Sequence, residues 1–522
     1  MHAAQRLLTH PRKLALALGG LAATGFEPLG LWPLALAAIA LQLELIARAD
    51  KARDAFLLGW LFGAAHFVIG LNWIVTAFGY QAAMPGWLGW IAEVGLSLYL
   101  AVWCGLAMMA AWRIARGRRH ALVLAMAGCW IIGEWLRGWV FTGFPWNPLG
   151  ALTLISDADP HLAYLAKGLG TYALSGLVVL LAGAWMLALH RGRRDWRAAA
   201  LVMVPPVLFL IPTAPAVQPQ GKLPYTLVQP DARQDDLHDP ARFEATFQRA
   251  MGLSQAAVRG QNRVVLWPES ALPDYLQAGY PAGWYASTTY GGDPLLARER
   301  IGRLIGPGSL LITGNDRLEL ENGRVVGARA GITAIDGQGQ IRATYDKAHL
   351  VPYGEYVPMK WLLVPLGIDR LVPGEIEFWP GPGPRTIDLG AWGKIGMQLC
   401  YEIIFPGKVT EPGRRPDFIF NPSNDGWYGD WGPPQHLAQA RLRAIEEGLP
   451  VLRSTTTGIS AVIDSDGVIR QSIPLRRAAR RDGMVPPAAE PTPFARLGNG
   501  LSLAWAILLL ALSVVACRRQ GR

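Results

Sequence analysis

The sequence predicts a two-part membrane protein: a multi-pass α-helical membrane domain of about eight transmembrane helices, and a soluble α/β domain inserted before the last of them. Two observations support this prediction. Hydrophobic residues make up 51% of the 522 residues and charged residues only 17%, which excludes a disordered or highly charged chain. Long apolar stretches lie at both ends of the chain, whereas residues 222–490 alternate short β-rich runs with helical patterns.

Seven apolar stretches precede residue 213 and an eighth lies near the C-terminus. Most approach the roughly 20 apolar residues that span a bilayer. The first also fits a signal peptide, but the number of spans behind it favours a retained helix. We expect an N-terminal membrane domain at 1–212 with seven transmembrane helices, a soluble domain at 222–490, and a C-terminal transmembrane helix at 499–517. The first seven stretches are 14–28, 30–47, 55–77, 88–112, 121–136, 164–189 and 198–212.

The formal net charge of +10 lies beside the apolar stretches. Residues 1–212 hold 16 basic and 9 acidic residues, residues 518–522 hold three arginines, and the signs balance in between. A nucleic-acid binder would need a basic patch in the soluble part, so this class is disfavoured. Within 1–212 the Lys and Arg residues gather in alternate loops. Because such loops stay in the cytoplasm, we expect cytoplasmic termini and an extracytoplasmic soluble domain.

The soluble part is predicted to be an α/β domain. β-rich runs occur at Tyr225–Gln229, Arg263–Trp267, Leu310–Thr313, Ile332–Ile335, Ile395–Leu399 and Asp417–Phe420, and helical patterns at about 240–259 and 435–447. The sequence has no dinucleotide fingerprint, phosphate-binding P-loop, zinc-ligand spacing or G-x-S-x-G elbow. Covalent catalysis without a cofactor or metal remains.

Three segments carry candidate chemistry. Glu269 follows an apolar run in VVLWPES (264–270), Lys347 and Glu355 lie in YDKAHLVPYGEYVP (345–358), and Cys400 and Glu402 lie in IGMQLCYEIIFP (395–406). Such groups gather at strand ends in α/β sheets.

These residue types suit a thiol nucleophile. A free thiol has a pKa near 8.5, roughly, so it needs a base such as Glu269, and an ammonium such as Lys347 stabilises the oxyanion. The backbone N–H of Tyr401 is a candidate second oxyanion donor. Each residue alone also has an ordinary interpretation. Glu269 could cap a helix, Lys347 could be a solvated side chain, and Cys400 could be an unreactive thiol in the core. Cys400 is the one cysteine of the soluble part, because the other three lie in apolar spans. The joint occurrence of the three residues favours catalysis.

WPES, YDKAHLVPYGEYVP and CYE resemble the Glu–Lys–Cys triad of the nitrilase, or carbon–nitrogen hydrolase, superfamily. With eight expected spans, the chain is most similar to the bacterial apolipoprotein N-acyltransferase family, and RGWVFTGFPWNPLG (137–150) and NPSNDGWYG (421–429) also match. The resemblance implies a nitrilase-like α-β-β-α sandwich seated on an eight-helix membrane base. It makes Glu269 the base, Lys347 the stabiliser of the tetrahedral intermediate and Cys400 the acylated nucleophile. It also implies that Glu355, Tyr401 and Glu402 support the site and that Trp427 gates an acyl chain.

One loop departs from the family pattern. The family usually reads V-Q-G-N after the first strand, with a Trp a few residues later, whereas this chain reads VQPDARQDDLHD (228–239). Pro230 and Asp231 stand at the V-Q-G-N position and His238 near that of the Trp. The substrate contacts of this loop therefore stay open.

The implied reaction moves an acyl chain from a phospholipid, of the phosphatidylethanolamine type, through a Cys400 thioester to the amine of a diacylglyceryl-cysteine on an apolipoprotein. This ping-pong reaction is the last step of lipoprotein maturation and belongs to the bacterial inner membrane, with the catalytic domain in the periplasm. An alternative is a membrane-tethered amidase or hydrolase with water as the acceptor. A transporter or receptor would require an accidental triad and polar residues along the spans, of which there are few.

Other segments carry expectations as well. The apolar, proline-broken segment Val357–Pro373 fits a lid that dips into the membrane interface, and equally an ordinary core segment. Glu93 and Glu134 are acids within expected spans. Glu134 and Arg137, at spacing i, i+3, fit a structural ion pair. Several Trp near span ends fit interface anchors: Trp73, Trp87, Trp90, Trp139 and Trp146.

Overall fold

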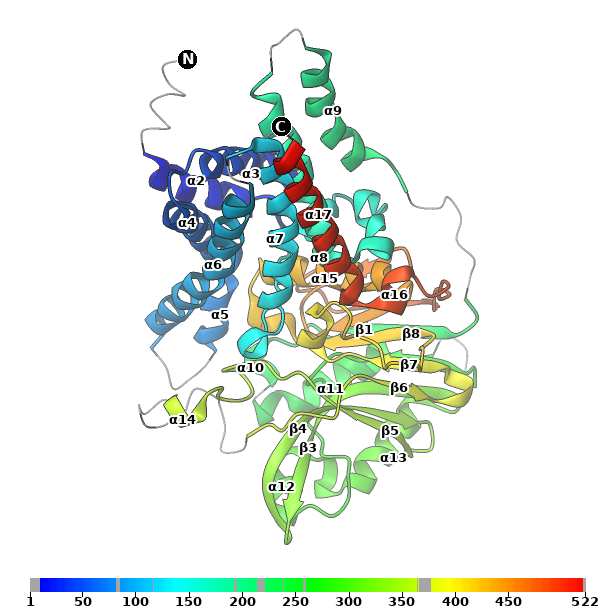
Figure 1. Cartoon of the computed structure of the whole chain (residues 1–522). Helices are drawn as coiled ribbons and strands as arrows, with labels where there is room; N and C mark the ends of the chain where they lie inside the picture. The colour runs from blue at the N-terminus through cyan, green and yellow to red at the C-terminus, as the bar shows by residue number, and fades with distance from the viewer. Residues whose placement is uncertain are drawn as a thin grey trace.

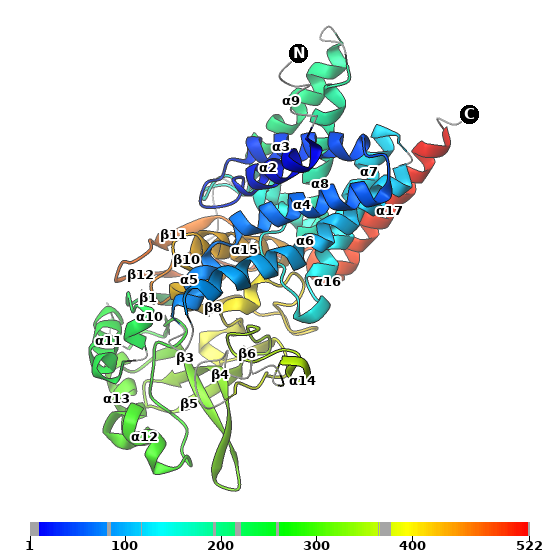
Figure 2. The same cartoon turned by 90° about the vertical axis from the view of Figure 1, so that its left-hand side faces the viewer.

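The computed structural model describes residues 10–80, 85–115, 117–191, 195–213, 221–237, 239–256, 260–363, 365 and 377–519. Helices from the first 213 residues and one helix from the C-terminal end form one part, and two stacked sheets with their helices form the other (Figures 1 and 2). The predicted combination of a helical domain and an α/β domain is confirmed.

Each of the eight apolar stretches forms a helix. Among the described residues, α4, α6, α17 and the stretch His161–Ala188, which ends in α8, are long and apolar enough to cross a membrane. The helices α3 and α9 are apolar but shorter, so the expected count of eight spans is not confirmed. The helices are α2 (Pro11–Ala23), α3 (Trp32–Ala47), α4 (Ala52–Gly70), α6 (Trp87–Ala115), α7 (Arg119–Arg137), α8 (Ala166–Ala188), α9 (Trp196–Leu210) and α17 (Asn499–Arg519), with the short α5 (Trp73–Gly79) after α4.

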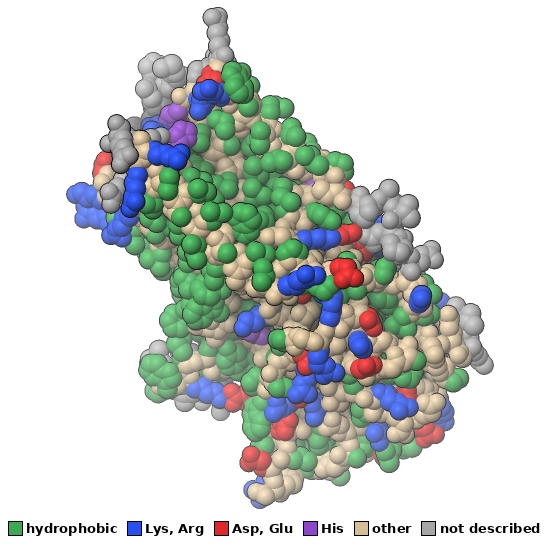
Figure 3. Space-filling model, turned by 45° about the vertical axis from the view of Figure 1, so that its right-hand side comes forward, with side chains coloured by type: hydrophobic (Ala, Val, Ile, Leu, Met, Phe, Trp, Pro, Cys, Tyr) green, Lys and Arg blue, Asp and Glu red, His purple; other side chains and the backbone are tan. Residues whose placement is uncertain are grey.

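Small residues allow these helices to pack closely. A Cβ atom at Gly19 of α2 would lie 2.0 Å from the carbonyl oxygen of Phe62 in α4, and one at Gly63 would lie 2.9 Å from the Cα of Ala101 in α6. Such contacts are typical of helices that associate in lipid. Figure 3 shows that hydrophobic side chains cover most of the helical part on that face, whereas charged side chains gather at its far end and over the sheets.

The basic loops lie together at one end of the helical part. The carboxylate of Glu44, near the end of α3, accepts hydrogen bonds from Arg48 at 2.6 Å and from Arg119 at 3.1 Å, and it lies 2.8 Å from His190. At the end of α17, the thiol of Cys517 contacts the carbonyl of Ala115. The ends of α3, α6, α8 and α17 and the start of α7 therefore share one side, away from the sheets (Figure 1).

Two six-stranded sheets form the core of the other part. The first has the order β12-β1-β2-β3-β4-β5 and the second β11-β10-β9-β8-β7-β6. In each, three central strands run parallel (β1-β2-β3 and β7-β8-β9) and the remaining pairs are antiparallel. The strands of the first sheet are β1 (Pro224–Gln229), β2 (Arg263–Leu266), β3 (Ser309–Glu321), β4 (Arg324–Asp336), β5 (Ile341–Asp346) and β12 (Ala479–Met484). Those of the second are β6 (Arg385–Asp388), β7 (Lys394–Met397), β8 (Phe418–Ser423), β9 (Val451–Thr455), β10 (Ser460–Ile463) and β11 (Ile469–Ile473).

Helices cover the outer faces of both sheets. On the first sheet lie α11 (Pro240–Leu253) and α13 (Pro294–Ile305), and their apolar residues share one core cluster with β1, β2 and β3. Each begins with an Asp whose side chain accepts the N–H two residues on, followed by Pro at the first helical position. On the second sheet lies α15 (Gly432–Glu447), whose Leu442 and Ile445 pack with Leu174 of α8. The predicted α-β-β-α layering is therefore confirmed, and α15 joins it to the helical part.

Candidate active site

Three strand ends bring the predicted residues to one place between the sheets. Glu269 follows β2 and Lys347 follows β5 in the first sheet, whereas Cys400 follows β7 in the second and begins the 3₁₀ helix Cys400–Ile404. Because the side chains come from facing sheets, the site depends on how the sheets stack.

Lys347 is held between two carboxylates. Its Nζ lies 2.6 Å from Oε1 of Glu355 and 3.6 Å from Oε1 of Glu269, and the side chain is only 1% exposed. Burial acts to lower the pKa of Lys347, but the attraction of Glu355 and Glu269 outweighs it and raises the pKa overall. The raised pKa favours the charged ammonium form of Lys347 inside the site. Glu355 also accepts the N–H of Val351 at 2.7 Å, which fixes the orientation of its carboxylate.

Glu269 is suited to take a proton. Its Oε2 accepts the backbone N–H of Asn424 at 2.8 Å. Burial raises the pKa of Glu269 above its ordinary value, while Lys347 opposes the shift and Glu355 adds to it. The carboxylate also acts on the Cys400 thiol, because its charge helps to raise the pKa of the thiol. A carboxylate with a raised pKa beside a thiol is the arrangement that general-base activation needs.

Cys400 is buried and its backbone is strained. Its φ of 50° lies in the left-handed region that residues with a Cβ seldom adopt. Burial, and next the charge of Glu269, raises the pKa of the thiol, so it stays protonated until a base removes the proton. Its carbonyl accepts a hydrogen bond from Asn421 at 3.4 Å and lies 3.2 Å from Nε2 of His436. These contacts hold the strained turn that presents the sulfur.

Glu402 joins the nucleophile turn to the lysine loop. Its carboxylate accepts the N–H groups of Leu399 and Ala348, both at 2.7 Å, and that of His349 at 3.1 Å. The hydroxyl of Tyr345 donates to both carboxylate oxygens, at 2.8 and 2.9 Å. Because Glu402 is buried and points to backbone donors of both sheets, it positions Lys347 relative to Cys400 and does not itself contact them.

Tyr401 connects the site to the helical part. Its hydroxyl donates to the carbonyl of Gly143 at 3.2 Å, and its ring packs against Phe144. Next to it, Nε2 of His349 lies 3.0 Å from the carbonyl of Thr142. The segment after α7 therefore lies directly against the nucleophile turn.

Trp427 contacts the helical part next to the site. It belongs to the 3₁₀ helix Asp425–Tyr428 and is partly exposed. Its ring makes an edge-on contact with Tyr80, at the end of α5, with 5.9 Å between centroids. The gate function expected for Trp427 stays a prediction.

Four residues that the sequence did not single out support the nucleophile. The hydroxyl of Tyr428 lies 3.6 Å from the sulfur of Cys400. Behind it, His436 lies 3.1 Å from Oδ1 of Asp425, and Arg453 donates to Asp425 at 2.6 and 2.7 Å. Burial, and next the charge of Arg453, lowers the pKa of His436 to about 4, so the imidazole is neutral. Asp425 and Tyr428 lie within the matching segment NPSNDGWYG (421–429), which was the available signal.

The loop that departs from the family pattern packs within the domain. Oδ1 of Asp231 accepts the hydroxyl of Thr457 at 2.6 Å, and the carbonyl of Pro230 accepts a hydrogen bond from Arg249 at 3.3 Å. His238 lies outside the described residues. The same holds for most of the expected lid Val357–Pro373, of which the short helix α14 (Lys360–Leu363) is described.

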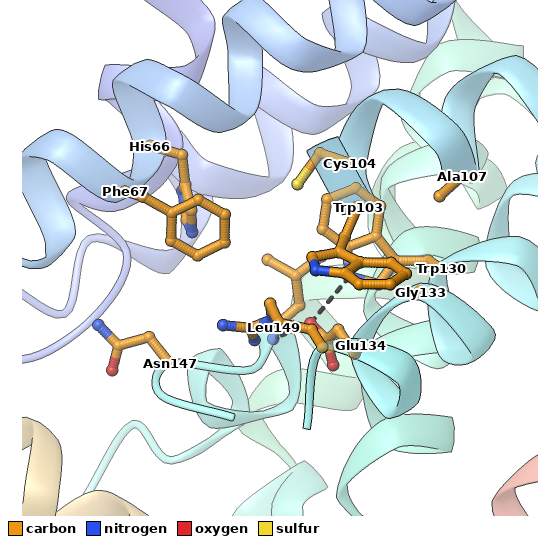
Figure 4. A pocket seen from close by; sticks show the side chains of 11 residues that line it. His66, Phe67, Trp103, Cys104, Ala107, Trp130, Gly133, Glu134, Asn147 and Leu149 are labelled. Carbon is orange, nitrogen blue, oxygen red and sulfur yellow. Dashed lines mark hydrogen bonds between the residues drawn. The ribbon is translucent and has the colours of Figure 1, made fainter. Parts of the chain in front are cut away.

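The expected Glu134–Arg137 ion pair is not formed. Oε1 of Glu134 instead accepts the indole N–H of Trp130 and the backbone N–H of Leu149, both at 2.9 Å, as Figure 4 shows around a small cavity. Arg137 donates to the carbonyls of Phe144 at 3.1 Å and Trp146 at 2.8 Å. The prediction of a pair was wrong because the following loop offers backbone partners to both side chains. Both side chains bind the backbone of the loop after α7, and the structural role expected for them stays a prediction.

The loop held by Glu134 and Arg137 contacts the site from the side of the helices. Trp146 in this loop packs against Tyr428 and donates to Gln435 of α15 at 2.8 Å. Elsewhere in the helices, Glu93 of α6 is buried and accepts the hydroxyl of Ser97 at 3.4 Å. In the described ranges no group of three His, Cys, Asp or Glu residues is arranged to hold a metal ion.

The two sheets and the Glu–Lys–Cys arrangement define a carbon–nitrogen hydrolase domain. A family model described as carbon-nitrogen hydrolase matches residues 226–475, and one described as apolipoprotein N-acyltransferase N-terminal domain matches 18–184. Relatives named apolipoprotein N-acyltransferase are 34% identical: that of Caulobacter vibrioides over 97% of this chain and 94% of its own, and that of Bradyrhizobium diazoefficiens over the same shares. The chain belongs to the apolipoprotein N-acyltransferase family. Among solved structures, Nit3 of Saccharomyces cerevisiae is 18% identical with a TM-score of 0.34, covering 53% of this chain and 93% of that one.

Proposed function

We propose that this protein transfers an acyl chain from a phospholipid to the N-terminal amine of a diacylglyceryl-cysteine on an apolipoprotein, by way of a thioester on Cys400. The observation that carries the proposal is the position of the thiol. It lies beside Glu269 and near Lys347, and through Tyr428 it borders Trp73 and Trp146 of the helical part. The names of the relatives support the same reaction.

In the first half-reaction Glu269 takes the thiol proton of Cys400 while the sulfur attacks the ester carbonyl. Lys347 and the N–H of Tyr401 stabilise the oxyanion. The C–O bond to the glycerol then breaks, Glu269 returns the proton to the departing oxygen, and a lysophospholipid leaves. The acyl chain remains as a thioester.

In the second half-reaction the neutral amine of the lipoprotein attacks the thioester. Glu269 takes the proton that the nitrogen loses, the C–S bond breaks, and the thiolate of Cys400 recovers a proton. The products are an amide and free enzyme. Glu355 orients Lys347 throughout, and Glu402 and Tyr401 hold the nucleophile turn against the lysine loop and the helical part.

We propose further that the protein divides into a membrane domain at 1–212, a catalytic domain at 222–490 and a transmembrane helix at 499–517, and that it resides in the bacterial inner membrane. The basic ends of α3, α7, α8 and α17 lie on the side away from the sheets. With the cytoplasm on that side, the catalytic domain lies in the periplasm and both termini lie inside. A phosphatidylethanolamine-type lipid is the proposed donor.

The test is mass spectrometry of the full-length protein in vesicles. Incubation with phospholipid should add one acyl mass to Cys400, and a diacylglyceryl-cysteine peptide should remove it and become acylated. Cys400→Ser should give no thiol-linked adduct, whereas Cys129→Ser, which changes a buried cysteine of α7, should leave the adduct intact. Rapid loss of the adduct to water, without acylated peptide, would instead support a hydrolase.

A further inference from the structure

Asp316 on β3 is aligned across the first sheet with Lys347, the residue that follows β5. It pairs with Ala330 across β3 and β4, and the carbonyl of Ala330 accepts the backbone N–H of Lys347 at 2.9 Å. Side chains directly opposite each other on antiparallel strands project on the same face of the sheet. Asp316 and Lys347 therefore project on one face, with only the methyl group of Ala330 between them.

That face is the one on which Glu269 lies. Gly314, two residues before Asp316 on β3, is so close to Glu269 that a Cβ atom there would lie 2.6 Å from the Cα of Glu269. Residues two apart on a strand share a face. The next residue, Arg317, points to the other face, where it forms an ion pair with Asp346 at 2.5 Å. Asp316 is thus directed at the active site and its basic neighbour is not.

The carboxylate of Asp316 is available to a ligand. Its side chain is exposed, and none of the described residues donates a hydrogen bond to it. Although solvent reaches this side chain, the surrounding protein atoms partly displace water from the carboxylate. This desolvation, and next the charges of Glu269 and Glu355, raises the pKa of Asp316 to about 7. Three carboxyl groups therefore share this space with one ammonium, that of Lys347. A second cation would relieve the repulsion.

We propose that Asp316 is a substrate-binding residue that receives a primary ammonium group beside Cys400. The inference rests on the proposed function, in which a primary ammonium occurs in both substrates: the ethanolamine headgroup of the donor and the N-terminal amine of the acceptor. A carboxylate accepts charge-assisted hydrogen bonds from such a group. Asp316 thereby selects substrates and does not take part in breaking or forming the acyl bonds.

The experiment measures both half-reactions separately for the full-length protein in vesicles. Asp316→Asn keeps the size of the side chain and removes its charge, and Glu321→Gln, at the exposed far end of β3, is the matched control. Loading of Cys400 is followed with phosphatidylethanolamine and with phosphatidylglycerol, which has no ammonium. Discharge is followed with the diacylglyceryl-cysteine peptide and with hydroxylamine, which reacts as a neutral molecule.

If Asp316 binds the headgroup, Asp316→Asn slows loading from phosphatidylethanolamine about tenfold or more and leaves loading from phosphatidylglycerol unchanged. If it binds the acceptor, the peptide reaction slows by this factor and the hydroxylamine reaction does not. Equal rates in every arm, or an equal loss in every arm, overturn the inference. Wild-type protein that forms no phospholipid-derived adduct overturns the proposed function as well, which separates the two failures.

Discussion

The sulfur of Cys400 lies 3.6 Å from the hydroxyl oxygen of Tyr428, and the ring of Tyr428 packs against Trp73 and Trp146. Trp73 begins α5, and Trp146 lies in the loop after α7 that Glu134 and Arg137 hold. One side chain therefore separates the nucleophile from the helical part. In the proposed reaction, this contact would bring the Cys400 thiol close to the helices that carry the lipid substrate.

Tyr428→Phe should slow thioester formation about fivefold, which corresponds to the loss of one hydrogen bond of ~1 kcal/mol. The hydroxyl stabilises the developing thiolate, whereas the ring contacts with Trp73 and Trp146 persist in the variant. Single-turnover loading of Cys400 measures the rate. Tyr225→Phe, which removes a hydroxyl that donates to Gln471 far from the thiol, is the control. Equal loading rates for both variants would show that the hydroxyl has no part in activation.

The rate at which phospholipid acylates Cys400 should rise with increasing pH and then reach a plateau. Glu269 acts as a base only when deprotonated, and burial raises its pKa, so the active fraction grows as the pH increases through a value above the ordinary ~4.3. Lys347 causes no decline below about pH 10, because Glu355 and Glu269 raise its pKa against the effect of burial. Measured kcat/KM for loading tests this. In Glu269→Gln, kcat/KM for loading should fall by a factor of roughly 10²–10⁴, and the remaining rate should no longer depend on pH in this range. A wild-type profile that falls between pH 5 and 8 would contradict the assignment.

Glu402→Gln should lower the stability of the protein and also slow the acylation of Cys400. The carboxylate accepts three backbone N–H groups and the Tyr345 hydroxyl, and the amide nitrogen of Gln would place a donor against these donors. An unsatisfied buried group costs about 1–3 kcal/mol. Thermal unfolding should show the loss in Tm, and loading should slow because Lys347 is displaced. Glu490→Gln, a change in the segment before α16 (Pro493–Leu497), provides the comparison. An unchanged Tm would refute the joining role of Glu402.

The neutral His436 should make the fold sensitive to acid. Burial, and next Arg453, lowers its pKa to about 4 from an unfolded value near 6.5. The unfolded chain therefore binds more protons than the folded one between these values, and stability falls as the pH drops from about 6.5 to 4, by up to ~3 kcal/mol from this group. Unfolding measured across this range should become less pH-dependent in His436→Gln, and His120→Gln, at an exposed histidine, should not change the slope. Parallel curves for His436→Gln and wild type would contradict the assignment.

The strands that the sequence predicted are those made of apolar, β-branched residues. All six predicted runs overlap strands, namely β1, β2, β3, β4, β7 and β8, with ends that differ by one or two residues in three of them. The strand β9 (VLRST) was not predicted because it contains Arg453, and arginine rarely lies in a core. Its charge is satisfied by Asp425, which comes from another part of the chain. Likewise β12 (ARRDGM) has a polar pattern because it is an edge strand with half-exposed side chains.

The same distinction separates the predicted site residues from those missed. Glu269, Lys347 and Cys400 follow strands, and strand ends meet at one place in this kind of fold. Tyr428 and His436 come to Cys400 only because α15 and the preceding 3₁₀ helix pack there, which local sequence does not reveal. The Glu134–Arg137 prediction failed for a related reason. Helical spacing placed the two charges near each other, but the partners that they use come from the next loop.

Trp361 should increase the affinity of the protein for donor lipid in a bilayer. It is 78% exposed on α14, a helix of the segment expected to act as a lid, and an indole at this position can enter the membrane interface. Trp361→Ala should raise the apparent KM for phospholipid in vesicles about tenfold, the equivalent of roughly 1.5 kcal/mol of apolar burial, and leave kcat unchanged. Trp196→Ala is the matched control, because Trp196 is 73% exposed but begins α9, at the end of the helical part away from the sheets. If both variants shift the KM equally, general membrane association explains the effect, and α14 has no special role at the site.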